Sequence, residues 1–434
     1  MKRKLLKFIL CIYLFLAIYA PPFFKFNILY ILSSISFLYL VKDRQIKIYI
    51  NKKVRMIWLT LSIILFIKIF IGIFFGDQEL INNRIIVLYQ WYGLIPMQFI
   101  VCLSIKKFAK KNRINNDNLL NLCINAGVIQ GVLVLLSFLS PEIRGYFLEM
   151  MKNNLDKESL YGEQGIIGYR AYGFAASLLD TFGYGMGLIL GILILLKDKK
   201  NILDWIKIFL CTLAIILNSR TGIIIFLLIF PVKILNFIFF KRKKSILKKL
   251  LKEFLVYTIA LTLGLYLINI SNLKSWIVYK WIMGGFESIL NFITGVKGEY
   301  RLGSMQNTFF TANFWKLPED FLGILIGRGH SIYGTKKILG IASDVGYINY
   351  IWIFGILGLV FLLYLVYSFF YNGIKTYKVK KEIIIFLALA FYTMMLKGNI
   401  ISYNSGTFIT IFILILYMED NKERIVFNKN VRKR

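Results

Sequence analysis

Apolar runs of about 20 residues recur along most of this 434-residue sequence, separated by segments rich in lysine and arginine. A helix of that length is long enough to cross the hydrocarbon core of a membrane. The composition agrees, because hydrophobic residues make up 58% of the chain and charged residues only 18%. The sequence therefore predicts an all-α fold, a polytopic helical bundle integral to a membrane.

About twelve membrane-spanning helices are expected. Their approximate bounds are 5–24, 28–41, 56–75, 85–105, 119–139, 174–196, 202–217, 223–240, 254–270, 347–370, 383–396 and 407–418. The first run follows three basic residues, as in a signal peptide, but Pro21 and Pro22 come directly after it and no small-residue cleavage site is visible. We therefore expect an uncleaved first span and a single membrane domain over 1–434.

The lysines and arginines indicate how the helices are oriented. When the N-terminus is placed inside, most of the 54 basic residues fall in cytoplasmic segments, so both termini are expected in the cytoplasm. A net charge of +32 would suggest a nucleic-acid partner in a soluble protein. Here most of that charge lies next to membrane headgroups, so we expect membrane lipids and no nucleic acid as partners.

Two long segments are expected on the outer face, 140–173 and 271–346. The second is a large external loop in which aromatic residues and glycines alternate with polar residues, a composition suited to folding against a membrane. Loops of this length without obvious helices are often lids or binding loops. We expect the loop 271–346 to cover an active-site cavity.

Four arginines on this face lie close to glycines, which lets backbone N–H groups approach the same ligand. Arg220 interrupts an apolar stretch within the tetrapeptide Ser-Arg-Thr-Gly at 219–222, and the other three are Arg170, Arg301 and Arg328. An arginine near membrane depth usually marks an anionic partner, and a guanidinium is a planar fork suited to phosphate oxygens. The alternatives are a turn between two helices for Arg220 and solvated loop charges for the others.

Two residues are candidates for proton transfer. His330 is the only histidine, which excludes a multi-histidine metal site and leaves a general base or an ordinary loop residue as interpretations. Asp344 precedes the span 347–370 and is either a base or a helix N-cap. The four cysteines lie in apolar runs at unrelated spacings and are interpreted as core residues. No metal or other cofactor is expected.

Four short segments carry a resemblance to a known family, through their order along the chain. They are Arg-Ala-Tyr-Gly-Phe at 170–174, Leu-Asn-Ser-Arg-Thr-Gly at 217–222, Arg301 followed by Gly-Arg-Gly-His-Ser-Ile-Tyr at 327–333, and Ser-Asp-Val-Gly-Tyr at 343–347 followed by Phe-Gly-Ile-Leu-Gly at 354–358. In this order they resemble the O-antigen polymerase and ligase superfamily, the Wzy-type polymerases in particular. Ligases of this superfamily place a histidine where this chain has Asp344, which favours the polymerase.

The resemblance implies polymerisation of polyprenyl-pyrophosphate-linked oligosaccharide repeat units at the outer leaflet of the bacterial cytoplasmic membrane, without a metal. In that scheme Arg220, Arg301, Arg170 and Arg328 bind the pyrophosphate, and Asp344 or His330 is the base. A chain-length regulator and a flippase are the implied partners. The alternatives are an O-antigen ligase, or a flippase or exporter of the same lipid-linked sugars, for which the long loop and the lack of an internal repeat are unfavourable.

Overall fold

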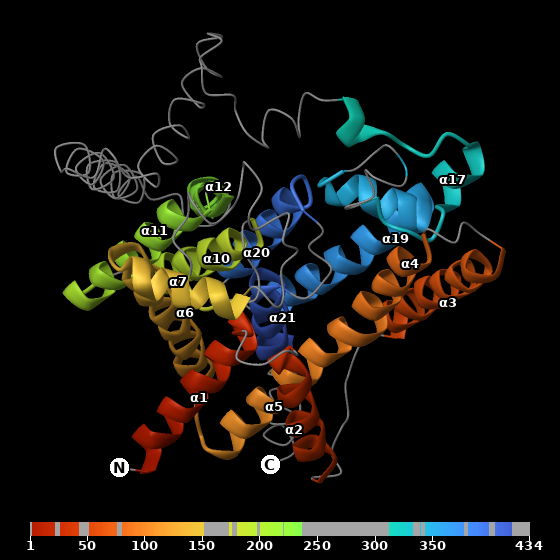
Figure 1. The fold of residues 1–434 in the computed structure, drawn as a ribbon. Helices are drawn as coiled ribbons and strands as arrows, with labels where there is room; N and C mark the ends of the chain where they lie inside the picture. The colour runs from red at the N-terminus through yellow and green to blue at the C-terminus, as the bar shows by residue number, and fades with distance from the viewer. Residues whose placement is uncertain are drawn as a thin grey trace, which may run out of the picture. The chain divides into compact units, whose positions relative to one another are not determined.

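The structure is a computed structural model, and it describes residues 2–21, 27–42, 52–75, 80–151, 173–175, 180–197, 200–219, 221–236, 312–332, 339, 343–376, 381–398 and 404–418. Regular structure in this part of the chain is helical, with no strand (Figure 1). The predicted all-α fold is confirmed for these residues.

Three helical stretches in the described part are long and apolar enough to cross a membrane: Ile81–Lys111, Asn116–Leu139 and Gly346–Ile374. Shorter apolar helices accompany them, at Ile28–Lys42, Trp58–Phe74, Thr181–Leu196, Thr221–Ile234 and Ser405–Tyr417. These helices support a membrane protein. The count of about twelve spans stays a prediction, and the expected span 254–270 lies outside the described residues.

The chain divides into two compact units. Unit 1 comprises Met1–Ala20, Asn27–Cys123 and Ser304–Arg434, and unit 2 comprises Pro21–Phe26 and Ile124–Gly303. Helix α6 (Asn116–Leu139) begins in unit 1 and ends in unit 2.

Unit 1 is a helical bundle whose longest helix, α19, packs against α3, α20 and α21. Its other helices pair along the same bundle, α2 with α5 and α5 with α21. The described helices are α1 (Lys2–Tyr19), α2 (Ile28–Lys42), α3 (Lys52–Phe75), α4 (Ile81–Leu88), the π-helix η2 (Tyr89–Leu94), α5 (Ile95–Lys111), the 3-10 helix η5 (Ala312–Trp315), α17 (Phe321–Ile326), α19 (Gly346–Thr376), α20 (Lys381–Met394) and α21 (Ser405–Met418).

Basic side chains hold the C-terminal end of α21 in unit 1. The Lys106 ammonium is buried and donates to the carbonyl oxygens of Ile415 and Leu416, at 2.9 and 3.0 Å. The last carbonyls of a helix have no partner within the helix, and a cation is a favourable partner for them.

A second basic residue joins the start of α1 to the α5–α6 connection. The guanidinium of Arg3 donates to the carbonyl of Arg113 (2.8 Å). The cytoplasmic location predicted for these basic residues stays a prediction.

The three elements α4, η2 and α5 form one continuous helical stretch that changes to π-helix for six residues. Pro96 stands at the start of α5 and has no N–H to donate, so the carbonyl one turn earlier lacks its usual partner. A π-helical insertion is a common way to accommodate such a break, and it is frequent at functional sites.

Unit 2 contains the rest of α6 together with α7 (Pro141–Met151), α10 (Asp180–Leu196), α11 (Ile202–Asn218), α12 (Thr221–Leu227) and α13 (Ile229–Asn236). Glycines allow α10 and α12 to approach closely. A Cβ added to Gly183 would lie 2.8 Å from the backbone nitrogen of Gly222, and one added to Gly187 would lie 2.9 Å from the Gly222 oxygen. Glycines four residues apart are a common contact between membrane helices.

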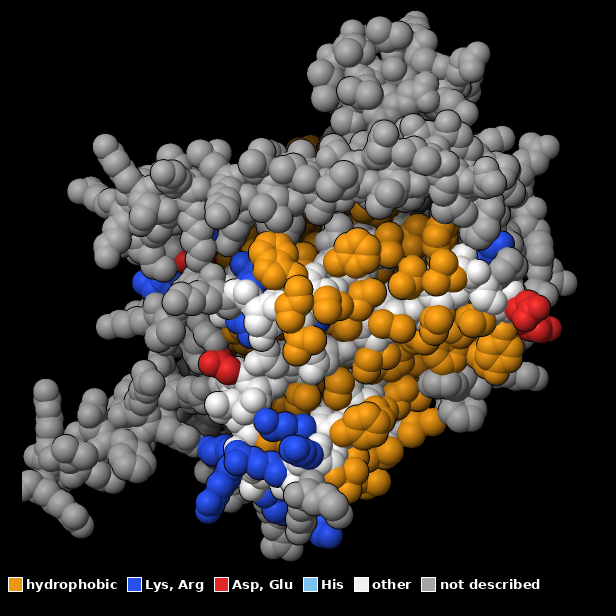
Figure 2. Space-filling model, turned by 90° about the vertical axis from the view of Figure 1, so that its left-hand side faces the viewer, with side chains coloured by type: hydrophobic (Ala, Val, Ile, Leu, Met, Phe, Trp, Pro, Cys, Tyr) orange, Lys and Arg blue, Asp and Glu red, His pale blue; other side chains and the backbone are white. Residues whose placement is uncertain are grey.

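Exposed side chains are largely apolar over much of the described surface. Figure 2 shows one face, on which hydrophobic side chains form a broad area and lysines and arginines gather toward one end. Exposed side chains on α3 include Ile63, Phe66 and Phe74, at 58, 55 and 63% exposure. A surface of this kind matches a hydrocarbon environment, because exposed apolar patches of such extent are rare in soluble monomers.

Candidate functional site

The clearest polar arrangement in the described residues is a loop of unit 1 that docks against an interruption in α19. Gly355 lies inside α19 with φ 76° and ψ 176°, so the helix is broken at this residue. The backbone N–H groups of Arg328 and Gly329 donate to the carbonyls of Trp352 and Ile353, at 2.7 and 3.2 Å. The loop thus supplies donors to carbonyls at the interruption, which stabilises backbone that lacks its usual helical partners.

Glycines make this close approach possible. Gly327 and Gly355 both have φ 76°, a left-handed region that favours glycine, and a Cβ on Gly327 would lie 2.5 Å from the Gly355 nitrogen. The glycines that the sequence showed around Arg328 and in the segment 354–358 therefore fit against one another in space. We call residues 316–332 the docked loop.

Arg328 lies on the outer side of the docked loop, with 44% of its side chain exposed. Its guanidinium pairs with the carboxylate of Asp320, with Nε 2.9 Å from Oδ1, and lies over the ring of Trp352 at 5.7 Å. Asp320 also caps α17 by accepting from the Gly323 N–H at 2.7 Å. The hydrogen bond from Arg328 lowers the pKa of Asp320 below its ordinary value, with the capping bond as the next cause. Arg328 is thus oriented by one carboxylate and one aromatic ring.

His330 lies on the inner side of the docked loop and is only 2% exposed. Its ring centre is 5.4 Å from that of Trp352, and its Nδ1 is 3.4 Å from the carbonyl of Ser331. In this conformation the imidazole is buried beside Trp352 of α19. Proton transfer by His330 stays a prediction.

A buried asparagine joins the docked loop to the start of α19. The Asn349 side chain is fully buried; its oxygen accepts from the Ser331 hydroxyl (2.6 Å) and the Ile332 N–H (3.1 Å). Its amide nitrogen donates to the carbonyls of Ser343 (2.8 Å) and Val345 (3.0 Å). All four hydrogen-bonding positions of the amide are therefore used. Asn349 is not among the residues predicted from the sequence, although a polar residue inside an apolar span is a recognisable signal.

Asp344 is half-buried in the segment that Asn349 holds. Its neighbours Ser343 and Val345 are buried, and the Ser343 hydroxyl donates to the carbonyl of Phe314 (2.6 Å). The structure therefore brings together the segments that carry Arg328, His330 and Asp344. The choice between a base and an N-cap for Asp344 stays open.

Lys68 is a further polar residue at the docked loop, contributed by α3. Its ammonium donates to the carbonyl of Gly327 (3.0 Å), and a Cβ on Gly329 would lie 3.3 Å from the Lys68 Cβ. From α4, the Asn83 side-chain oxygen accepts from the Ser331 N–H (2.9 Å). Neither residue is among the site residues predicted from the sequence, although a lysine within an apolar run is itself a signal of function.

The other three predicted arginines, Arg170, Arg220 and Arg301, lie outside the described residues. The neighbours of Arg220 are described, and they are buried in unit 2: Ser219 is 2% and Thr221 is 7% exposed. Helix α11 ends before Ser219 and α12 begins at Thr221, so the choice between an anionic site and a turn between two helices stays open for Arg220. Whether the four arginines converge stays a prediction.

The remaining side chains to consider are possible metal ligands and the cysteines. Among the described residues, no group of three or more His, Cys, Asp or Glu side chains is arranged to hold a metal ion. All four cysteines are buried, which confirms their interpretation as core residues.

These features define a helical protein with three helices long and apolar enough to cross a membrane and with a polar loop fixed at an interrupted helix. No protein-family model, curated protein or solved structure matches the chain.

Proposed function

We propose that this protein is a membrane glycosyltransferase of the O-antigen polymerase type, which joins polyprenyl-pyrophosphate-linked repeat units at the outer leaflet of the bacterial cytoplasmic membrane. The observation that carries the proposal is the docked loop. It holds Arg328 against α19 and joins the segments that carry His330 and Asp344. A lipid-linked substrate requires a combination of polar and apolar surfaces.

The reaction needs stabilisation of negative charge more than it needs a strong nucleophile. The acceptor hydroxyl oxygen forms a bond to the anomeric carbon of the donor, and the bond from that carbon to the pyrophosphate oxygen breaks. The polyprenyl pyrophosphate leaves with the bonding electrons, so negative charge grows on its oxygens. Arg220, Arg301, Arg170 and Arg328 are the residues proposed to stabilise this charge, because fixed guanidinium groups do so without a metal.

The proton of the attacking hydroxyl goes to a base, for which Asp344 and His330 are the candidates. Asp344 lies in the segment fixed by Asn349, and this supports its placement next to a substrate held by the docked loop. A chain-length regulator and a flippase are the partners that such a polymerase would require.

The test is the surface glycan of a strain that lacks the gene. Loss of the polymer ladder with retention of single-repeat material supports a polymerase. Accumulation of polymer still attached to the lipid carrier would indicate a ligase, and accumulation of single units on the inner leaflet would indicate a flippase; either result overturns the proposal.

Complementation then tests the residues. Arg328→Ala and Arg220→Ala should each abolish chain growth while the protein still reaches the membrane, whereas Arg144→Ala, on α7, should restore the ladder. Arg220→Lys should also fail, because an ammonium cannot reproduce a forked contact to phosphate.

A further inference from the structure

Helix α17 of the docked loop carries apolar side chains that face away from the protein. Phe321 is 74% and Leu322 is 64% exposed, and Ile326, about one turn after Leu322, is 42% exposed. The helix itself is fixed, because Asp320 caps its start and its last residues lie against Gly355. These side chains therefore form a small apolar surface that is held in place and open to a contact from outside the chain.

Charged side chains of the same loop are exposed beside this surface. Lys316 pairs with Glu319 at 3.1 Å, and Arg328 pairs with Asp320. The four charges balance, so the loop has little attraction for an oppositely charged protein surface. Exposed apolar side chains next to paired charges are typical of a segment at the boundary between the hydrocarbon core and the headgroups of a membrane.

The α4–η2–α5 stretch separates the docked loop from a basic end of unit 1 by about the thickness of a hydrocarbon core. Beyond Asn83, which binds the loop at Ser331, the stretch from Ile85 to Ile105 carries no charged residue. At 1.5 Å per residue it is about 31 Å long, close to the roughly 30 Å core. Figure 1 shows α17 at the top of unit 1 and α5 running toward the bottom. The basic residues that follow are Lys106, Lys107, Lys110 and Lys111.

The exposure of α19 changes where the docked loop contacts it. From Gly346 to Gly355 the residues of α19 are buried or half-buried. Directly after Gly355 apolar side chains become exposed, for example Ile356 and Val360 at 41 and 58%. The part of α19 from Ile356 to its end at Thr376 is about 31 Å long. An exposed apolar surface therefore begins at the docked loop, on a helical segment that is long enough to cross the hydrocarbon core.

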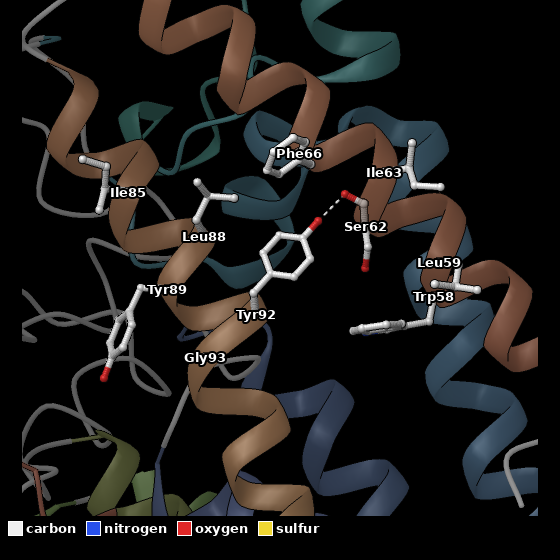
Figure 3. A pocket seen from close by; sticks show the side chains of 10 residues that line it. All are labelled: Trp58, Leu59, Ser62, Ile63, Phe66, Ile85, Leu88, Tyr89, Tyr92 and Gly93. Carbon is white, nitrogen blue, oxygen red and sulfur yellow. Dashed lines mark hydrogen bonds between the residues drawn. The ribbon is translucent and has the colours of Figure 1, made fainter. Parts of the chain in front are cut away.

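Helices α3 and α4–η2 expose apolar side chains as well. Figure 3 shows these side chains around a groove between the two elements, and Ile63 and Phe66 of α3 are 58 and 55% exposed. The Tyr92 hydroxyl at the groove donates to the Ser62 carbonyl, so this polar group has its partner within the protein (Figure 3). The side chains exposed here are therefore of the kind that suits acyl chains.

We propose that α17 anchors the docked loop to the lipid bilayer, with Phe321 and Leu322 among the acyl chains at the boundary opposite the basic end. The exposed charges of the loop then lie in the headgroup layer. Continuity favours the bilayer over a second copy of the chain, because the exposed apolar surface of α19 begins at the residue against which α17 lies. The inference rests on the helices of unit 1 crossing a membrane, and it holds whichever reaction the protein catalyses.

The experiment measures what surrounds α17 in the full-length protein, reconstituted into vesicles of phosphatidylethanolamine and phosphatidylglycerol. A nitroxide is attached to Phe321→Cys or to Leu322→Cys. Its collision rate with oxygen, which concentrates in hydrocarbon, is compared with its collision rate with a water-soluble nickel chelate. All four native cysteines are buried, so the reagent reaches the introduced thiol, and wild-type protein treated in the same way gives the background.

Two matched controls define the extremes. Phe361→Cys replaces an aromatic residue of α19 that is 50% exposed, and Glu319→Cys replaces a docked-loop residue whose side chain is 78% exposed. At Phe321→Cys and Leu322→Cys the oxygen collision rate should exceed the nickel rate severalfold, as at Phe361→Cys. At Glu319→Cys the nickel rate should be the higher one.

Two results would overturn the anchor. A higher collision rate with the nickel chelate than with oxygen, at either position of α17, would place that side chain in water. Low collision rates with both reagents would place it against protein, as in a contact with a second copy of the chain.

Discussion

The docked loop of unit 1 and the α10–α12 contact of unit 2 each hold a polar segment among apolar helices, but they do so by different means. The loop is held by hydrogen bonds that the Arg328 and Gly329 N–H groups donate to carbonyls of α19. Asn349 accepts a further hydrogen bond from the Ile332 N–H of the loop and donates one to the Ser343 carbonyl. The α10–α12 contact depends on the absence of side chains at Gly183 and Gly222.

This difference follows from whether the helix backbone is interrupted at the contact. Gly355 interrupts α19, and an unpaired carbonyl in hydrocarbon costs several kcal/mol, so the interrupted helix needs a donor from elsewhere. Helices α10 and α12 are not interrupted where they meet, and close packing is sufficient there. An interrupted membrane helix therefore calls for a partner segment, whereas an intact pair needs only small residues.

The largest effect is expected from Gly355→Val. Valine at φ 76° is strained, and its Cβ would collide with the backbone of Leu325 and Ile326, so the loop cannot dock. We expect a loss of about 3 kcal/mol or more in the free energy of unfolding, measured by denaturant titration in detergent. Gly145→Ala is the control, since no atom lies within 4 Å of the added Cβ, and its change should stay within about 0.5 kcal/mol. Equal stability of the two variants would contradict the docking.

The next effect concerns the hydrogen bonds of the loop. Asn349→Leu keeps the branching of the side chain but removes the amide, so the four groups that bond to it lose their partner and a loss of about 2–3 kcal/mol is expected. Limited proteolysis should also show faster cleavage within 316–332. Thr60→Val removes a hydroxyl at an exposed position of α3 and should leave both measurements unchanged. If the docked loop of Asn349→Leu were cleaved no faster than that of the wild type, the Asn349 amide would not be what holds the loop.

A smaller effect is expected from Gly183→Ala in unit 2. The added methyl would lie 2.6 Å from the Ser219 hydroxyl oxygen and 2.8 Å from the Gly222 nitrogen, so the helices must separate. Overpacking of this kind costs about 1–2 kcal/mol, which the same denaturant titration resolves. If the variant were as stable as the wild type, the contact would not depend on close approach.

The smallest effect is the pH response of the Arg328–Asp320 pair. Because the folded pKa of Asp320 is lowered from 3.8, the pairing is fully present above that value and is lost as the pH falls through the lower, folded pKa. Fluorescence of Trp352, on which Arg328 lies, should therefore be constant from neutral pH to about pH 5 and change only below about pH 4. Asp320→Asn should remove this transition. A fluorescence transition near neutral pH would mean that a group other than Asp320 is titrating.

Some of this protein could be predicted from local sequence and some could not. The apolar runs predicted helices, and the structure has them where it describes the chain, for example at Asn116–Leu139 and Gly346–Ile374. The glycines near Arg328 were recognised as unusual, but their fit against Gly355 was not, because it depends on the path of the loop between them. Asn349 and Lys68 were not predicted as site residues for a related reason. A polar residue in an apolar run gives no information about which group its side chain contacts.

The sequence by itself determined that this chain forms apolar helices suited to a membrane, because hydropathy is a property of each segment and needs no knowledge of its neighbours. Only the tertiary structure decided which polar groups meet. Lys68 and Asn83 reach Gly327 and Ser331 across separations of 259 and 248 residues. Such contacts are set by how the helices pack, and packing depends on the shapes of many side chains together, which a single sequence does not disclose.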